Sequence, residues 1–168
     1  MTYKLRNINK IVLAVCICFG GFFNSWAGEV EYLEKTCNEK SVEAASACTQ
    51  LGKKYDVGWG AMYDGVWIVK QDFNKAAELY KKGCKLKDAE GCQKLGVLYV
   101  TGKGVKPNDK KAEKLFKKAC EEDYALGCYH LGLLYELHAN NKMAYKYYKK
   151  ACMRVRNACA SSYRVKNK

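Results

Sequence analysis

The chain has 168 residues, a formal net charge of +13 and only one proline. That length suits one domain, and no Pro/Gly/Ser-rich linker divides it, so we expect no second domain. The excess of positive charge makes nucleic acid and membrane surfaces partners to consider.

Residues 1–27 have the pattern of a secretory signal peptide. A basic start is followed by an apolar run over residues 11–23 and by a small-x-small cleavage site at residues 25–27. The apolar run is shorter than the ~20 residues that span a bilayer, so we expect no transmembrane anchor. A lipoprotein signal ending at Cys16 is the alternative. We predict cleavage after Ala27 and a secreted or periplasmic location.

The cysteines then reveal an internal repeat. Eight of the ten lie beyond the signal peptide, in four close pairs, and an even number in an exported chain indicates a disulfide framework. Around three of the pairs, Leu-Gly, tyrosine and alanine recur at fixed distances. We therefore predict one repeat domain over 28–168, with units at approximately 28–71, 72–107 and 108–139 and a capping unit at 140–168.

The sequence pattern of each unit predicts two antiparallel helices. Positions 0, +3 and +7 from the second cysteine share one helical face, as in Cys92, Leu95 and Tyr99. Lysines near the first cysteine complement the negative C-terminus of their helix. The glycine at +4 is expected to let helix backbones approach closely. N-caps are expected 12 residues before the first cysteine, at Asp72, Asn108 and Asn140.

The same spacing predicts the disulfides. The first cysteine ends one helix, about six residues turn the chain, and the second cysteine opens the next helix, which brings the two within bonding range. Each bridge should contribute ~2–3 kcal/mol. Zinc is a poorer interpretation because no C-x-x-C occurs, and we expect no metal or other cofactor. The expected pairs are Cys37–Cys48, Cys84–Cys92, Cys120–Cys128 and Cys152–Cys159.

One motif connects the chain to a known family. The pattern A-x-x-x-[YF]-x-K-[AG]-C-x(6)-G-C-x-x-L-G-x-L-Y occurs at 76–99 and 112–135, with partial copies at 37–55 and 144–163. On these residues the chain resembles the cysteine-rich Sel-one-like repeat proteins of the secreted Hcp group, over residues 29–165. The resemblance implies an all-α, right-handed α-solenoid of disulfide-linked antiparallel helix pairs. It also implies penicillin binding with weak β-lactamase activity, or a role as an interaction module.

The residues of known β-lactamase mechanisms are missing from the mature sequence. No serine is followed by lysine three positions later, and neither Ser-Asp-Asn nor Lys-Thr-Gly occurs. A zinc enzyme needs about three protein ligands. Only His130 and His138 are present, and eight helical positions place them roughly 80° apart. The catalytic residues therefore stay unknown, and any β-lactam hydrolysis is expected to be slow.

A ligand groove is the remaining prediction. In related repeats the inner helices line a concave surface, and positions +2 and +9 from the second cysteine avoid the core stripe. The family often has asparagine at +2, suited to clamping a peptide backbone. Lys94 and His130 favour a carboxylate instead, as in a peptide, a peptidoglycan-like ligand or a β-lactam. The alternative is that these are ordinary solvated positions. The candidates are Gln50, Lys94, His130, Thr101 and Leu137.

The lysines do not indicate a nucleic-acid partner. They recur at equivalent repeat positions, and the aromatic residues occupy mainly core positions instead of alternating with the lysines as stacking platforms. We expect a monomer that binds a peptide, a peptidoglycan-like or β-lactam ligand, or another protein. An anionic polymer of the cell envelope is a further alternative.

Overall fold

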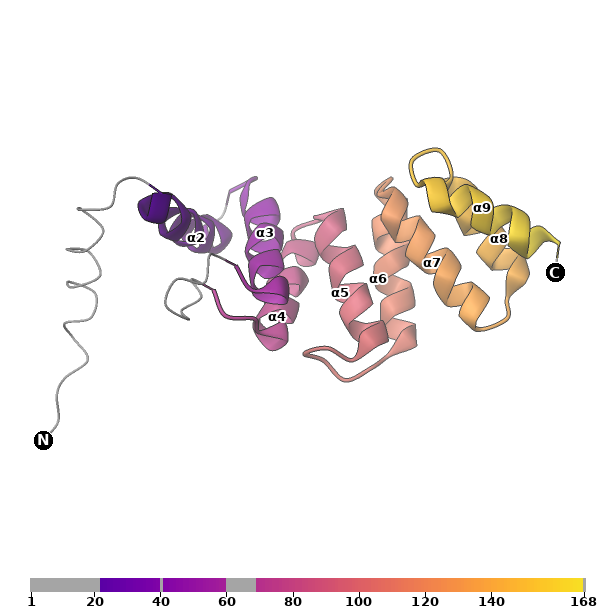
Figure 1. Cartoon of the computed structure of the whole chain (residues 1–168), viewed down its shortest axis with the longest axis horizontal. Helices are drawn as coiled ribbons and strands as arrows, with labels where there is room; N and C mark the ends of the chain where they lie inside the picture. The colour runs from indigo at the N-terminus through magenta and orange to yellow at the C-terminus, as the bar shows by residue number, and fades with distance from the viewer. Residues whose placement is uncertain (1–21, 40, 60–68, 168) are drawn as a thin grey trace, which may run out of the picture.

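In the part of the chain that the structure describes, eight α-helices stand in a row, each packed against the next in sequence, with α2 at one end and α9 at the other (Figure 1). The computed structural model describes residues 22–39, 41–59 and 69–167, with side chains from residue 28 onward. Within these ranges there is no strand, only an isolated antiparallel bridge between Trp59 and Val69. The predicted all-α solenoid is confirmed. Its helices are α2 (Phe22–Asn38), α3 (Ala44–Val57), α4 (Phe73–Lys85), α5 (Ala89–Thr101), α6 (Asp109–Glu121), α7 (Ala125–Leu137), α8 (Asn141–Ala151) and α9 (Arg156–Lys166).

The predicted signal peptide lies mostly outside the described residues. Residues 1–21 are not described, and α2 begins at Phe22, so the predicted cleavage site after Ala27 falls inside this helix. None of the helices described here combines the length and the hydropathy needed to cross a membrane. The connection between α3 and α4 is rich in aromatic residues, and we call it the aromatic insertion. Its residues 60–68 also lie outside the described ranges.

The predicted N-caps are confirmed at three helix starts. The side chains of Asp72, Asn108 and Asn140 each accept a hydrogen bond from the backbone N–H three residues later, at 3.0, 2.8 and 3.2 Å. These bonds satisfy amides that the helix itself leaves without partners. The starts of α4, α6 and α8 are therefore fixed by local sequence.

Each pair of helices is joined by a disulfide, and the four bonds link Cys37–Cys48, Cys84–Cys92, Cys120–Cys128 and Cys152–Cys159. The Cα atoms of the pairs are 4.5 to 4.7 Å apart. The turns are shorter than predicted. Helix α4 continues beyond its cysteine and α5 begins before its own, so only residues 86–88 connect them, where about six were expected.

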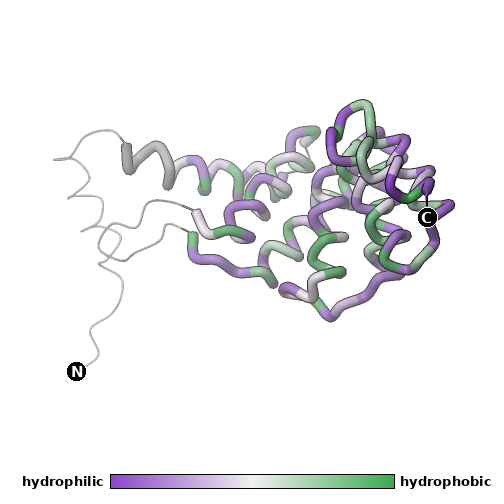
Figure 2. The backbone as a smooth tube through the Cα atoms, turned by 45° about the vertical axis from the view of Figure 1, so that its right-hand side comes forward, coloured by the Kyte–Doolittle hydropathy of each residue, from purple (hydrophilic) through white to green (hydrophobic). Residues whose placement is uncertain are grey.

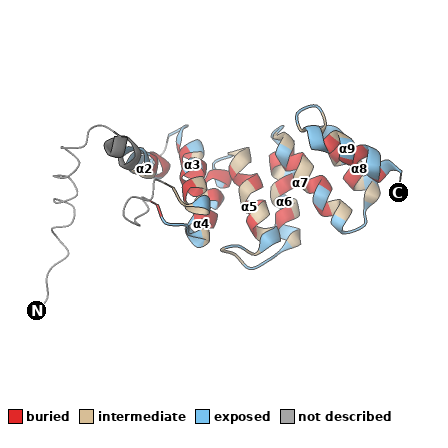
Figure 3. Ribbon diagram, viewed as in Figure 1, coloured by how far each residue is buried: buried red, intermediate tan, exposed pale blue. Residues whose placement is uncertain are grey.

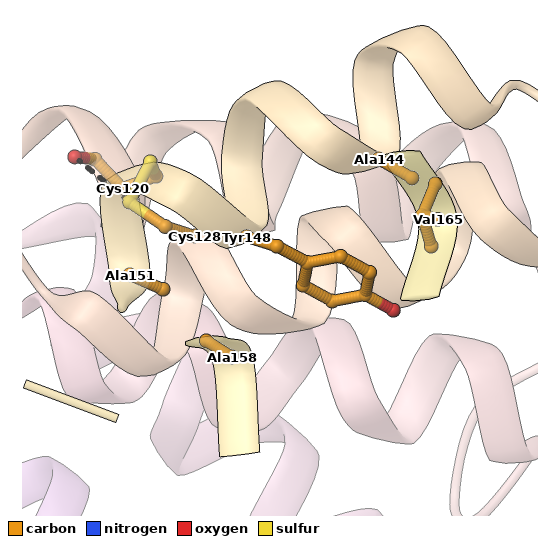
Figure 4. Packing of buried hydrophobic residues seen from close by; sticks show 7 residues of the cluster. All are labelled: Cys120, Cys128, Ala144, Tyr148, Ala151, Ala158 and Val165. Atoms are coloured by element: carbon orange, nitrogen blue, oxygen red, sulfur yellow. Dashed lines mark hydrogen bonds between the residues drawn. A yellow bond between two sulfur atoms is a disulfide. The ribbon is translucent and has the colours of Figure 1, made fainter. Parts of the chain in front are cut away.

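The glycine at +4 has a different role from the one predicted. Its nearest neighbours are aromatic side chains and not another backbone. A Cβ at Gly96 would lie 2.5 Å from the ring of Phe116, and one at Gly132 would lie 2.6 Å from that of Tyr148. Figure 4 shows the Tyr148 ring lying between the Cys120–Cys128 disulfide and Val165. The glycines therefore make room for a ring of the following hairpin.

Gly52 lies against the ring of Tyr80 in the same way. The rings of Tyr80 and Tyr148 are also held by a hydrogen bond. The hydroxyl of Tyr80 donates to Asp56 at 3.1 Å, and that of Tyr148 donates to Glu136 at 2.7 Å. Burial, reinforced by the neighbouring carboxylate, raises the pKa of both tyrosines above its ordinary value. Both hydroxyls stay protonated, and each ties a hairpin to the one before it.

The middle junction lacks this hydrogen bond. Phe116 stands where the other junctions have tyrosine, and Val100 stands where they have the carboxylate. Because the tyrosine hydroxyl and the carboxylate are both absent from this junction, neither group is buried there without its hydrogen-bond partner. The junction between α5 and α6 is consequently apolar.

Two lysines connect consecutive hairpins. Lys118 Nζ donates to the carbonyl of Cys84 at 2.7 Å, and Lys150 Nζ donates to that of Cys120 at 2.9 Å. Both carbonyls lie in the last turn of a helix, where a cation is favourable. The sequence predicted that such lysines complement their own helix, whereas these two reach the helix of the preceding hairpin.

The helices α3, α5 and α7 form one face of the solenoid. Contacts join α3 to α5 and α5 to α7, and the outer helices α4, α6 and α8 make no comparable contacts with one another among the described residues. Closer approach on one side makes that side the concave one. Along each helix the buried positions alternate with exposed ones (Figure 3), as do hydrophobic and hydrophilic residues (Figure 2).

Candidate functional site

Three adjoining hollows run along the concave face, and we call them together the groove. The first has a volume of about 310 Å³, the central one about 360 Å³ and the third, the apolar hollow, about 220 Å³. Lys94 lines the first and central hollows, and Thr101 and His130 line the central and apolar ones. Gln50 lies in the first hollow and Leu137 in the apolar one. The structure thus brings all five candidate residues to one continuous surface.

The buried side chain of Lys54 forms part of the wall of the first hollow. The ammonium of Lys54 forms an ion pair with Glu29 at 2.9 Å and lies 3.6 Å from the centre of the Trp59 ring. A cation–π contact of this kind is stronger when the ring and the ammonium are shielded from water. Trp59 belongs to the aromatic insertion after α3, while its companions Tyr63 and Trp67 lie outside the described residues. The described start of the insertion thus supplies part of the wall of the first hollow.

The acidic residues of the central hollow already have partners. Glu90 pairs with Lys53 at 3.0 Å, and Asp56 accepts the hydroxyl of Tyr80. Their charge is therefore partly neutralised or committed to the fold. These carboxylates are poor candidates for binding a cationic ligand.

The lysines of the central hollow are less engaged. Within the described ranges, Lys94 makes no hydrogen bond or ion pair, and Lys103 only places its ammonium 5.1 Å from the centre of the Phe73 ring. An ammonium without a counter-ion in a partly enclosed site favours an anionic ligand. The structure therefore supports a carboxylate-binding role for Lys94.

His130 does not supply the positive charge that the sequence suggested. Its ring stacks on Phe116 with centroids 5.4 Å apart, and its Nδ1 lies 2.7 Å from the carbonyl of Leu126. Burial lowers the pKa of His130; the bond to Leu126 opposes this shift, and the charge of Lys94 adds to it. A neutral ring must donate its Nδ1–H to that carbonyl, because a carbonyl only accepts. His130 therefore presents a neutral imidazole, with Nε2 as its acceptor.

Gln93 is a groove residue that the sequence reasoning missed. Its side chain is only 3% exposed and its Nε2 lies 3.3 Å from His130 Nδ1. A protonated Nδ1 donates, so at this distance it suits the amide oxygen of Gln93 and not its NH2 group. With the amide oriented that way, His130 satisfies the oxygen, which in the other orientation is buried without a partner among the described residues. The signal was available in the sequence, because glutamine at +1 is polar beside the core cysteine.

No catalytic or metal site is evident in the described part of the chain. None of the residues lining the three hollows is a serine. Among residues 28–39, 41–59 and 69–167, no cluster of three His, Cys, Asp or Glu side chains could hold a metal ion. His138 instead pairs with Asp109 at 3.1 Å, away from His130.

Comparison with protein families identifies the repeats. The Sel1 repeat matches residues 45–88, 89–124 and 123–154. Each matched segment contains the second helix of one hairpin and the first helix of the next. These boundaries are shifted by one helix from the units predicted from the cysteine pairs.

Individual relatives have similar repeats. The β-lactamase candidate HcpC of Helicobacter pylori strain J99 is 49% identical over 39 residues, which is 23% of this chain and 13% of HcpC. The solved cysteine-rich protein HcpB of H. pylori is 39% identical, over 55% of this chain and 61% of that one, with a TM-score of 0.46. A Sel1 repeat protein from Oxalobacter formigenes has a TM-score of 0.63 and 25% identity, over 74% of this chain and 50% of that one. The chain thus covers less than two thirds of each.

Proposed function

The chain belongs to the Sel1 repeat family, and from that premise we propose that it is an exported interaction protein that binds an extended peptide or a peptidoglycan-like peptide in its groove. One observation carries the proposal. The hollows along α3, α5 and α7 adjoin, and their lining includes Gln50, Lys94 and His130. A continuous groove fits an elongated ligand better than a compact one.

The chemistry of the groove supports a peptide with a carboxylate. The ammonium of Lys94 is free to pair with such an anion. The neutral ring of His130 offers an acceptor for a backbone N–H. Together these groups suit a polypeptide backbone that bears negative charge.

The disulfides support the export part of the proposal. All eight cysteines of the described residues are paired. Such bonds persist in oxidising compartments and are rare in the cytosol. Together with the predicted signal peptide, they favour action outside the cytoplasm.

We expect the triple variant Gln50→Ala/Lys94→Ala/His130→Ala to lose binding to peptides that the wild-type protein selects. Phage-displayed random peptides would be enriched on immobilised wild-type protein, and the affinities of the enriched sequences measured by calorimetry. Loss of the charged contact alone should weaken binding by about tenfold or more.

The matched control is Lys114→Ala, which removes the same charge from an exposed position on α6. It should bind like the wild type. Failure to enrich any peptide, or equal affinity of the triple variant, would contradict a peptide-binding groove.

Slow β-lactam hydrolysis is the second candidate, because HcpC is named as a β-lactamase candidate. The groove lining offers no serine nucleophile and no metal cluster within the described residues. We therefore expect metal-free, refolded protein to turn over nitrocefin no faster than the buffer blank. Steady-state turnover above the blank that the triple variant abolishes would establish a hydrolase.

A further inference from the structure

The apolar hollow exists because one junction between hairpins lacks a polar pair. At the other two junctions a tyrosine donates to a carboxylate on the preceding helix, as in Tyr80 and Asp56. Here Phe116 and Val100 occupy those positions, and both line the hollow. Its other walls are all apolar except for Thr101 and His130. Thr101 donates its hydroxyl to the carbonyl of Val97 at 2.9 Å, so it is satisfied within its own helix.

The apolar residues of this hollow are partly open to solvent. Val100, Leu133 and Leu137 are 39%, 37% and 70% exposed. A volume of about 220 Å³ is below the ~300–1,000 Å³ typical of pockets for drug-sized molecules. The hollow is therefore suited to one side chain of a longer ligand and not to a whole small molecule.

Lysine ammonium groups lie at both ends of α5, the helix beside the apolar hollow. Lys94 stands near the start of α5 and Lys103 just beyond its end, and both line the central hollow. Nine residues of helix correspond to about 13 Å along the axis. A single terminal carboxylate supplies only one negative charge, whereas two acidic side chains about four residues apart on an extended peptide match this backbone spacing. The apolar hollow lies beside the second half of α5, between these positions.

We infer that the apolar hollow is a specificity pocket for one aliphatic side chain of an extended acidic peptide. The acidic side chains on either side of that residue pair with Lys94 and Lys103. This inference rests on the proposed peptide-binding function and deepens it. The occupant is an internal segment, in which two acidic side chains four residues apart supply a carboxylate at each end of α5.

The test uses peptides with acetylated and amidated ends, so that no terminal carboxylate is present. One peptide carries leucine with aspartate two residues to either side. A second has alanine in place of the leucine, and a third has asparagine in place of both aspartates. We expect calorimetry on the full protein to give the leucine peptide about tenfold or more higher affinity than the alanine peptide, as expected for burial of an aliphatic side chain.

A double variant is designed to close the pocket while keeping the fold. Val100→Asp/Phe116→Tyr reproduces the pairing of Tyr80 with Asp56. It should keep its melting transition and bind the leucine and alanine peptides equally. Leu137→Ser provides a second variant at a largely exposed position and should reduce the preference for leucine. Leu86→Asp, which adds one negative charge in the turn between α4 and α5, is the control and should retain the preference.

The outcomes separate this inference from the proposed function. Equal affinity of the wild type for the leucine and alanine peptides, with loss of binding in Lys94→Ala, overturns the pocket and leaves the groove. Tighter binding of a peptide that ends in leucine with a free carboxylate overturns the internal segment. Absence of binding by every capped peptide overturns the pocket, and absence of any enriched library peptide overturns the function as well.

Discussion

Replacing Cys120 and Cys128 together by alanine is expected to lower the free energy of unfolding by about 2–5 kcal/mol. The disulfide is almost fully buried and packs with Tyr148 and Ala151 in the core of the last two hairpins. Its loss removes a constraint on the unfolded chain and leaves a cavity. A repeat touches only its neighbours in a solenoid, so no distant contact replaces the bond. Urea unfolding followed by helical circular dichroism measures the change.

The control for this prediction is the double replacement of Cys152 and Cys159 by alanine. That disulfide closes a shorter segment at the end of the solenoid, and its cysteines are less buried. A smaller loss of stability is expected there. An unchanged urea midpoint in the Cys120/Cys128 variant would show that packing alone holds the hairpin.

Substituting valine at Gly132 is expected to destabilise the protein by about 1–3 kcal/mol or more. The new Cβ would lie 2.6 Å from the ring of Tyr148, which is fully buried. The ring cannot easily move, because its hydroxyl is held by Glu136 at 2.7 Å. The clash should therefore outweigh the gain in helix propensity that valine brings relative to glycine. Thermal unfolding of the variant tests this.

Two further variants make the cause specific. Gly28→Ala, where an added Cβ meets nothing within 4 Å, should change stability by only a few tenths of a kcal/mol. Combining Gly132→Val with Tyr148→Leu should cost less than the sum of the two single changes, because the smaller side chain relieves the clash. Strictly additive losses would argue against a direct contact between this glycine and the ring.

Much of the fold could be predicted because its determinants are local and repeated. The caps at Asp72, Asn108 and Asn140 act within three residues, and the cysteines pair across one short turn. The role of the +4 glycine could not be predicted in the same way. Its neighbour is a ring from the next hairpin, and spacing alone does not reveal which atoms of that hairpin approach it.

The groove was predictable in position but not in chemistry. Helical periodicity identified Gln50, Lys94 and His130 because it depends only on residue spacing. The charge state of His130 depends on its burial against Phe116, which comes from a different hairpin. Gln93 escaped notice because its position belongs to neither the core stripe nor the solvent-facing set. Its significance comes from its contact with His130, a residue of the next hairpin.

The contacts between hairpins have an implication for engineering. Each junction needs only a glycine from the earlier hairpin, and a ring and a lysine from the later one, as with Gly132, Tyr148 and Lys150. A duplicate of residues 108–139 inserted after residue 139 carries these three groups, but its Phe116 would face Glu136 of the first copy, which has lost Tyr148 as its donor. Changing that phenylalanine to tyrosine restores the pair, and the insertion then lengthens the superhelix by one unit. A tyrosine with a carboxylate at the added junction would close the hollow there, whereas a phenylalanine with a valine would leave a hollow that can bind a ligand side chain.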